Sequence, residues 1–276
     1  MILETGLMSE EPHLLVETVD DTILVATFNR PDKLNAMSNE LMRLLEEAVD
    51  HYRETPELKV MLIKSHGRYF SSGADLREGG GAKGFPTRGS QIRETHRRLP
   101  SGMRRVWDEM EGMEKPFVVA HHARCVGGSL EMSLSCDFRL AAKSASYAFP
   151  EAKFGVLPAT NGVSRLVRIV GTHWARWMIT ANMPVDADEA RMMGLVHKVY
   201  PDETFEEDVL AFCRHLAKQD SEMVGASKVA IELAKDLPAH QAASVERLVN
   251  SSLMLSPHYK DLMMAHVASI GKGKGG

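Results

Sequence analysis

The chain of 276 residues is 44% hydrophobic and 25% charged, which suits one large globular core and argues against a disordered or fibrous chain. Lys and Arg total 33 against 37 Asp and Glu, a net charge of −4, so we expect neither nucleic acid nor a membrane as a partner. The three cysteines lack C-x-x-C spacing and the first twelve residues do not resemble a signal peptide, so we expect a cytoplasmic protein without disulfides or zinc.

The first predicted elements are a hairpin and a helix. Short β-branched runs at residues 14–19 and 23–28 flank Asp20-Asp21, the pattern of two strands joined by a tight turn. Ser38 then precedes apolar residues at helical spacing, which predicts a helix that ends near Arg53.

Further along, four runs of residues resemble strands and alternate with helical segments. Residues 60–63 and 117–120 are wholly apolar, as expected for strands buried on both faces of a sheet. Residues 138–142 and 196–199 give similar signals. The alternation predicts an α/β fold.

Two segments differ in character from this pattern. The glycine-rich residues 78–86 predict a loop, either a lid over a site or a tolerated surface insertion. From residue 205 to about 266, amphipathic helices follow with almost no strand signal, which predicts a C-terminal helical subdomain. Its apolar stripe is expected to form core, with part of it facing another subunit, and includes Leu253, Met254, Leu262, Met263 and Met264.

Three segments carry residues suited to catalysis. In Phe70 to Leu76, small residues let backbone N–H groups approach a ligand, although a simple turn explains them equally well. In Cys125 to Glu131, two glycines begin a predicted helix whose free N–H groups would stabilise an oxyanion. The alternative, non-catalytic role of Glu131 is to offset the dipole of that helix. Glu151 follows a proline among apolar residues, which would raise its pKa unless it is a solvated loop residue.

The order and spacing of these segments resemble the crotonase superfamily, and specifically its enoyl-CoA hydratases. The resemblance runs from Val16 to Pro201 and implies a crotonase-like spiral of ββα repeats over residues 12–203, which holds the coenzyme A site. Residues 204–270 would be the helical subdomain used for oligomerisation. The motifs that carry the resemblance are NRPDKLNAM at 29–37, FSSGADL at 70–76, VGGSLEMSLSCD at 126–137, FPEAKFGVLP at 149–158 and LVRIVG at 166–171.

The resemblance also implies roles for single residues. Those matching Ala74 and Gly128 donate backbone N–H groups to the thioester oxygen and form the oxyanion hole. Glu131 would activate water and Glu151 would exchange a proton at the α-carbon, because hydration needs both transfers. Contacts with substrate and coenzyme A are expected at Lys33, Leu34, Ser72, Asp75, Leu76, Arg77, Gly127, Pro158 and Ala159.

The resemblance implies which other molecules are needed. No metal or redox cofactor is expected, because coenzyme A is part of the acyl-CoA substrate and the chemistry is proton transfer. The protein partners implied are copies of the chain, as a homotrimer or a dimer of trimers. Ser129 stands where the family has a third glycine, and residues 159–162 replace a glycine-rich turn, so the chain length and class of the acyl group stay open.

Other features have weaker functional interpretations. Ser129 lacks the complete G-x-S-x-G elbow of serine hydrolases, and His121-His122 lacks the further ligands of a metal site. A basic cluster suits coenzyme A phosphates or RNA, but interspersed acids favour a solvated face. It comprises Arg93, Arg97, Arg98, Arg104 and Arg105.

The leading hypothesis is therefore an enoyl-CoA hydratase. The alternative within the same fold is a Δ3,Δ2-enoyl-CoA isomerase, which typically works with one carboxylate, or another crotonase-type acyl-CoA lyase or hydrolase. A remote alternative from a different class is an RNA-binding or scaffold member without catalysis. The intact pair of carboxylates argues against that alternative.

Overall fold

The computed structural model describes residues 11–78 and 103–270. The chain divides into two compact units, Met1–Lys218 and Gln219–Gly276. Most of the glycine-rich segment at 78–86 lies outside the described residues, as do Arg93, Arg97 and Arg98.

The first unit opens with the predicted hairpin, which is confirmed. Strands β1 (Leu14–Val19) and β2 (Ile23–Phe28) pair antiparallel, with Leu14 opposite Phe28. Asp20 and Asp21 both have positive φ, 51° and 56°. Two such residues form the kind of turn whose twist matches that of the flanking strands, and aspartate tolerates this conformation better than most residues.

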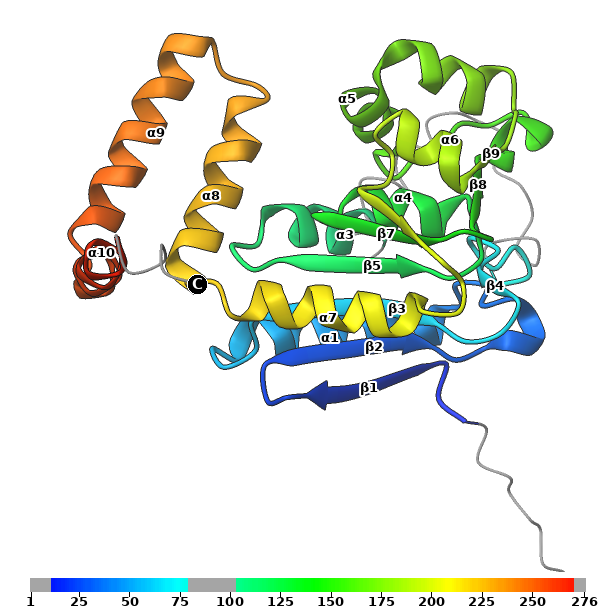
Figure 1. Ribbon diagram of the computed structural model, residues 1–276. Coiled ribbons are helices and arrows are strands. Elements are labelled where there is room, and N and C mark those ends of the chain that lie inside the picture. The colour runs from blue at the N-terminus through cyan, green and yellow to red at the C-terminus, as the bar shows by residue number, and fades with distance from the viewer. Residues whose placement is uncertain (1–10, 79–102, 271–276) are drawn as a thin grey trace, which may run out of the picture. The chain divides into compact units, whose positions relative to one another are not determined.

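Beyond the hairpin, four strands extend the sheet in parallel. They are β3 (Val60–Ser65), β5 (Phe117–His121), β7 (Phe138–Ala142) and β10 (Lys198–Tyr200). The order across the sheet is β1-β2-β3-β5-β7-β10 (Figure 1). The first three of these strands lie where the sequence predicts them. The strand predicted at 196–199 begins later, because the amide of Val196 bonds to the carbonyl of Ala190 instead.

A second, smaller sheet was not predicted. It contains β4 (Tyr69–Ser71), β6 (Arg124–Val126), β8 (Ser146–Ala148) and β9 (Val185–Asp186), in the order β4-β6-β8-β9. Each of β3, β5 and β7 in the large sheet is followed directly by one of these short strands. Successive turns of the chain therefore add one strand to each sheet, which is the spiral that the sequence predicts.

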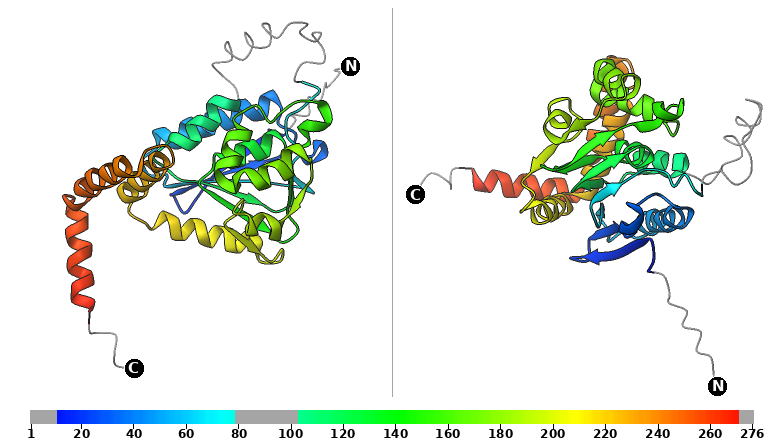
Figure 2. Two further views of the ribbon diagram at one scale, coloured as in Figure 1. Left: turned by 90° about the horizontal axis from the view of Figure 1, so that it is seen from above. Right: turned by 90° about the vertical axis from the view of Figure 1, so that its right-hand side faces the viewer.

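Helices cover both faces of the large sheet in the first unit. Helices α1 (Asn39–Glu54) and α3 (Met103–Gly112) lie on one side of the strands and α7 (Phe205–Ala217) lies on the other (Figure 2). Trp107 and Tyr52 are fully buried in the core on the first side, and Phe205 is buried in the core on the second. Helix α1 begins where predicted, at Ser38, whose side chain accepts a hydrogen bond from the amide of Leu41. Because α7 packs on the sheet, residues 204–218 lie with the first unit.

The described part of the second unit contains three helices, as the helical pattern predicts. They are α8 (Ser221–Ala234), α9 (Ala239–Met254) and α10 (Pro257–Ser269). The methionine and leucine stripe is not part of the core within the described chain, and the expected contact of part of it with another subunit stays a prediction. Helix α10 has no buried residue, and Met264 is 72% exposed. Among the described helices, none combines the length and apolar character needed to cross a membrane.

Candidate active site

Two loops that hydrogen-bond to each other form one side of the site. The first contains η1 (Pro31–Lys33) and turns through Leu34 and Asn35, which both have positive φ. The buried Asn35 side chain donates to the carbonyls of His66 and Tyr69 at 2.7 and 2.9 Å and accepts from the amide of Arg30. Both N–H donors of its amide group and its carbonyl oxygen are thereby engaged, which fixes the loop.

The second loop, residues 71–77, lies against the first. The amide of Ser72 donates to the carbonyl of Leu34 at 2.9 Å. Met37 then pairs with Ala74 as an isolated parallel bridge, through the carbonyl of Gly73 and the amide of Asp75. Since successive residues of an extended strand point their amides to opposite sides, the amide of Ala74 faces away from this bridge.

The amides of Ala74 and Gly128 lie side by side. Gly127 precedes α4 (Gly128–Leu134) with φ 59° and ψ −133°, a conformation that favours glycine. A Cβ at Gly73 would lie 3.3 Å from the nitrogen of Gly128, and one at Gly128 would lie 3.6 Å from the nitrogen of Ala74. Neither amide has an acceptor within the described part of the chain. The structure thus places two N–H donors together, as an oxyanion hole requires.

Glu131 projects from the first turn of α4 toward a turn at residues 158–162, of which Pro158 and Gly162 are buried. Its Oε1 accepts hydrogen bonds from the amide of Thr160 at 2.8 Å and of Gly162 at 3.2 Å. Burial raises the pKa of Glu131, while the Thr160 hydroxyl, these two amides and the charge of Arg165 oppose that rise. The ionised form of Glu131 is therefore held in place by specific donors.

Glu151 reaches the same region from η2 (Pro150–Phe154). A Cβ at Gly127 would lie 3.0 Å from its Oε1, so the carboxyl group lies over the glycine that precedes the oxyanion hole. Its Oε2 is buried and has no hydrogen-bond partner in the described part of the chain. Burial raises the pKa of Glu151 to about 7, and the charge of Glu131 adds to the increase.

The two carboxyl groups therefore differ in the form that each favours. The ionised Glu131 has two amide donors, whereas Glu151 has lost hydration without gaining a donor at Oε2. A proton shared by the pair accordingly favours Glu151 near neutral pH. Such a pair can remove a proton at one position and donate one at another.

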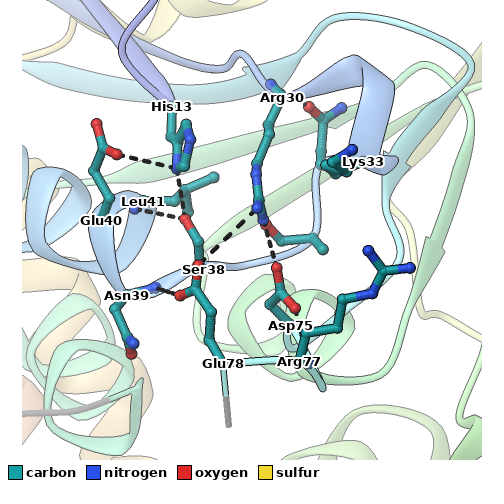
Figure 3. A network of polar contacts seen from close by, with 12 residues as sticks. His13, Arg30, Lys33, Ser38, Asn39, Glu40, Leu41, Asp75, Arg77 and Glu78 are labelled. Atoms are coloured by element: carbon teal, nitrogen blue, oxygen red, sulfur yellow. Dashed lines mark hydrogen bonds and ion pairs between the residues drawn. The ribbon is translucent and has the colours of Figure 1, made fainter. Parts of the chain in front are cut away.

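Three of the predicted coenzyme A residues, Lys33, Asp75 and Arg77, lie at a polar network around Arg30 (Figure 3). Arg30 donates to Oδ2 of Asp75 at 2.6 Å and lowers the pKa of Asp75. The other oxygen of Asp75 accepts the amide of Arg77 at 3.0 Å, so this carboxylate is used to shape the loop. Three residues expected to contact coenzyme A, Lys33, Leu76 and Arg77, are exposed.

Pro158 and Ala159 lie beside the turn that binds Glu131. Pro158 is buried, and its Cβ would be 2.7 Å from a Cβ at Gly162. Ala159 is exposed. An open cleft of about 520 Å³ borders this turn and is lined by Pro158, Ala159, Asn161, Val163, Ser164, Val167 and Arg168.

The other chemical candidates have structural partners. His121 is fully buried between Ser133 and the hydroxyl of Tyr147, and burial lowers its pKa to about 3. The hydroxyl of Ser129 donates to the carbonyl of Val126 at 2.8 Å. Arg104 and Arg105 pair with acids on α3 and α1. Within residues 11–78 and 103–270, no group of three or more potential ligands is arranged to bind a metal.

Three residues around the site were not predicted from the sequence: Asn35, Asp108 and Arg165. Asn35 lies inside the NRPDKLNAM motif, which is a signal that sequence analysis can use. Asp108 and Arg165 meet across 57 residues of chain, at 2.7 Å. No local pattern indicates that contact.

Comparisons with known proteins agree with this geometry. The sequence model of the Enoyl-CoA hydratase/isomerase family matches residues 18–267. The mitochondrial enoyl-CoA hydratase of Pongo abelii is 25% identical over 90% of this chain and 82% of its own. The crotonyl-CoA hydratase of Syntrophomonas wolfei is 28% identical over 82% of this chain and 84% of its own. The solved enoyl-CoA hydratase of Bacillus anthracis superposes with a TM-score of 0.84 at 25% identity, over 93% of this chain and 96% of its own. The predicted crotonase-like fold is confirmed.

Proposed function

Because the chain belongs to the enoyl-CoA hydratase/isomerase family, we propose that it adds water across the double bond of a 2-enoyl-CoA thioester. The observation that carries this proposal is a pair of carboxyl groups in different surroundings beside paired backbone donors. Burial raises the pKa of both, but two amides oppose that rise at Glu131, whereas Glu151 holds a proton near neutrality. Hydration needs one group of each kind.

The thioester oxygen would accept hydrogen bonds from the amides of Ala74 and Gly128. As water attacks the β-carbon, electrons move toward that oxygen and the intermediate resembles an enolate. Donors already in position stabilise this charge without rearranging, and one such donor typically contributes ~10²–10³ in rate. The locked loops at residues 29–37 and 71–77 support this role, because they keep the Ala74 amide in place.

The proton transfers then follow from the two carboxyl groups. Glu131 takes a proton from water while the hydroxide adds to the β-carbon, and Glu151 gives its proton to the α-carbon. We propose that both groups act on the same face of the acyl chain, which makes the addition syn. The pair ends with its single proton on Glu131, and exchange with solvent returns it to Glu151.

The remaining residues would bind coenzyme A. The exposed side chains of Lys33 and Arg77 are suited to its phosphates, and the backbone of residues 72–77 to its adenine and pantetheine portions. The mechanism uses only side chains and backbone amides, so coenzyme A enters as part of the substrate. We also propose cytoplasmic location and assembly as a trimer or a dimer of trimers. The exposed apolar side chains of the second unit support self-association.

A Δ3,Δ2-isomerase is the second candidate, because one proton-exchanging carboxyl group and the same oxyanion hole suffice for it. The hydrogen bonds to Glu131 favour the hydratase, since an ionised base held in a fixed position is what water activation requires.

The experiment that tests the proposal is incubation of the full chain with crotonyl-CoA and with longer and aromatic 2-enoyl-CoA thioesters. We expect loss of the enoyl absorbance together with a product heavier by one water in mass spectrometry. The matched control is the Glu131→Gln, Glu151→Gln double variant, which should be inactive. Inactivity of the unaltered protein toward the whole panel, or movement of a double bond without addition of water, would refute the proposal.

A further inference from the structure

The turn that binds Glu131 is tied to helix α3 by two side chains. Asn161 donates from Nδ2 to Oδ1 of Asp108 at 2.8 Å, and Arg165 donates from Nη2 to the same oxygen at 2.7 Å. Asp108 lies on α3, whereas Asn161 and Arg165 lie at the start of α5 (Gly162–Ala175). One carboxylate oxygen therefore joins two helices at the edge of the site.

Asn161 combines two properties that no other residue type offers as well at this position. Its φ is 67°, in the left-handed region that asparagine and glycine tolerate best. A glycine there would keep the backbone but would lose the bond to Asp108. The asparagine thus makes the turn and fastens it to α3.

Arg165 fastens the turn from its other side. The side chain is only 4% exposed, and it donates to Oε2 of Glu111 at 2.8 and 3.0 Å as well as to Asp108. Its Nη1 also donates to the carbonyl of Thr160 at 3.3 Å. A buried guanidinium requires partners of this kind, so the position of Thr160 depends on the acids of α3.

We propose that Asp108 is a positioning residue for Glu131, which it places by holding the Thr160 and Gly162 amides through Asn161 and Arg165. Asp108 binds the side chains of Asn161 and Arg165, and these two residues hold the turn. The turn donates two amide hydrogen bonds to Oε1 of Glu131. The inference rests on the proposed hydration, in which Glu131 activates water. Asp108 itself touches no reacting atom.

The path also sets the charge environment of Glu131. The charged groups around it are Glu151 on η2, Arg165 on α5, and Asp108 and Glu111, which meet Arg165 from α3. Arg165 and the two amides lower the pKa of Glu131 against the effect of burial. If the turn moves, Arg165 and the two amides lie farther from Glu131, and the pKa of Glu131 rises further. The acid limb of the rate profile then moves to higher pH.

Three variants test the proposal on the full chain, with enoyl-CoA hydration as the assay. Asp108→Ala removes both bonds, and Asn161→Gly removes one while keeping the backbone conformation. We expect each to lower kcat, Asp108→Ala roughly ten- to a hundredfold, with little change in KM, and to move the acid limb of the kcat profile to higher pH. Asp108→Asn, which keeps an oxygen at the same place, should recover part of the loss. Asp108→Ala and Asn161→Gly share one bond, so their effects should not add.

The matched control is Glu46→Gln, which removes one of the two acidic partners of Arg105 and so an ion pair between α1 and α3 away from the turn. It should leave kcat and the acid limb unchanged. An active protein whose Asp108→Ala and Asn161→Gly variants keep the original kcat and profile would overturn the positioning role alone. An equal change in Glu46→Gln would overturn it too, because it would show a general effect of loosening α3. Absence of hydration in the unaltered protein would overturn the proposed function together with this inference.

Discussion

A Cβ at Gly162 would lie 2.6 Å from Oε1 of Glu131, closer than two such atoms approach in real structures. The carboxylate therefore occupies the space of a side chain at this position. Gly162 also donates its amide to the same oxygen, at 3.2 Å. Glu131 can therefore lie in this position only because residue 162 has no side chain.

The Gly162→Ala variant should lose most of its hydratase activity. The new methyl group would displace the Glu131 carboxylate from the Thr160 and Gly162 amides, and a misplacement of about 1 Å can cost a hundredfold in rate. The measurement is kcat with a 2-enoyl-CoA. The matched control is Gly112→Ala, because a Cβ at Gly112 meets no atom within 4 Å. Equal activity of the two variants would show that Glu131 is not held as described.

The Gly73→Ala variant should damage the oxyanion hole. A Cβ there would lie 2.8 Å from the carbonyl oxygen of Val126 and 3.3 Å from the nitrogen of Gly128, in a residue whose φ is +86°. The neighbouring Ala74 amide would move, and loss of one donor costs ~10²–10³ in rate. The loss should appear in kcat, and because residues 72–77 are also proposed to contact coenzyme A, the dissociation constant of coenzyme A should rise as well. Unaltered kcat would contradict the assignment of the Ala74 amide.

The rate of hydration should depend on pH as a bell-shaped curve. Below the pKa of Glu131 both carboxyl groups carry protons and no base remains, and above about 7 Glu151 is ionised and no acid remains. Adding water neither consumes nor releases a proton, so the kcat/KM profiles of hydration and of the reverse dehydration should coincide. Measuring both directions checks this. A hydration rate that does not fall as pH rises above about 7 would contradict Glu151 as the acid of the pair.

The Glu151→Gln variant should be more stable than the original protein above neutral pH, although it is less active. The folded-state pKa of Glu151 is about 7, above its ordinary value of 4.5, so the folded state binds more protons than the unfolded state between these values. Stability is therefore lost as pH rises through this range. Replacement by glutamine removes that loss, and the gain in Tm should be larger at pH 8 than at pH 4.5. A gain that shrinks as pH rises would show that Glu151 is not held in its neutral form.

Much of the fold follows from local patterns in the sequence. Short β-branched runs on either side of Asp20-Asp21 predict the hairpin, and the apolar runs at 60–63 and 117–120 predict buried strands. Each of these predictions depends only on residues that are close together in the sequence. The small sheet was missed because its strands of two or three residues are too short to show a period. The leucine and methionine residues of α9 and α10 expected to form core are not buried within the described chain, because their spacing does not say what covers them.

Some residues of the candidate site can likewise be predicted from local sequence, and others cannot. Glu131 and Glu151 can be identified because each lies within a short motif, one after two glycines and one after a proline. The support around Glu131 cannot be predicted from such motifs, since Asp108 and Asn161 meet across 53 residues of chain. Asp75 was expected to contact coenzyme A, yet Arg30 engages its carboxylate from 45 residues away. Long-range polar contacts of this kind depend on the packed fold.

The division of labour between the two carboxyl groups can be measured directly, by following hydration of a 2-enoyl-CoA and deuterium exchange at the α-carbon of a saturated acyl-CoA in D₂O. Exchange needs the oxyanion hole and Glu151 but no attacking water. Glu131→Gln should therefore lose hydration by about 10²–10⁴ while it retains exchange, and Glu151→Gln should lose both. Full hydration by Glu131→Gln, or undiminished exchange by Glu151→Gln, would contradict the assignment of base to Glu131 and acid to Glu151.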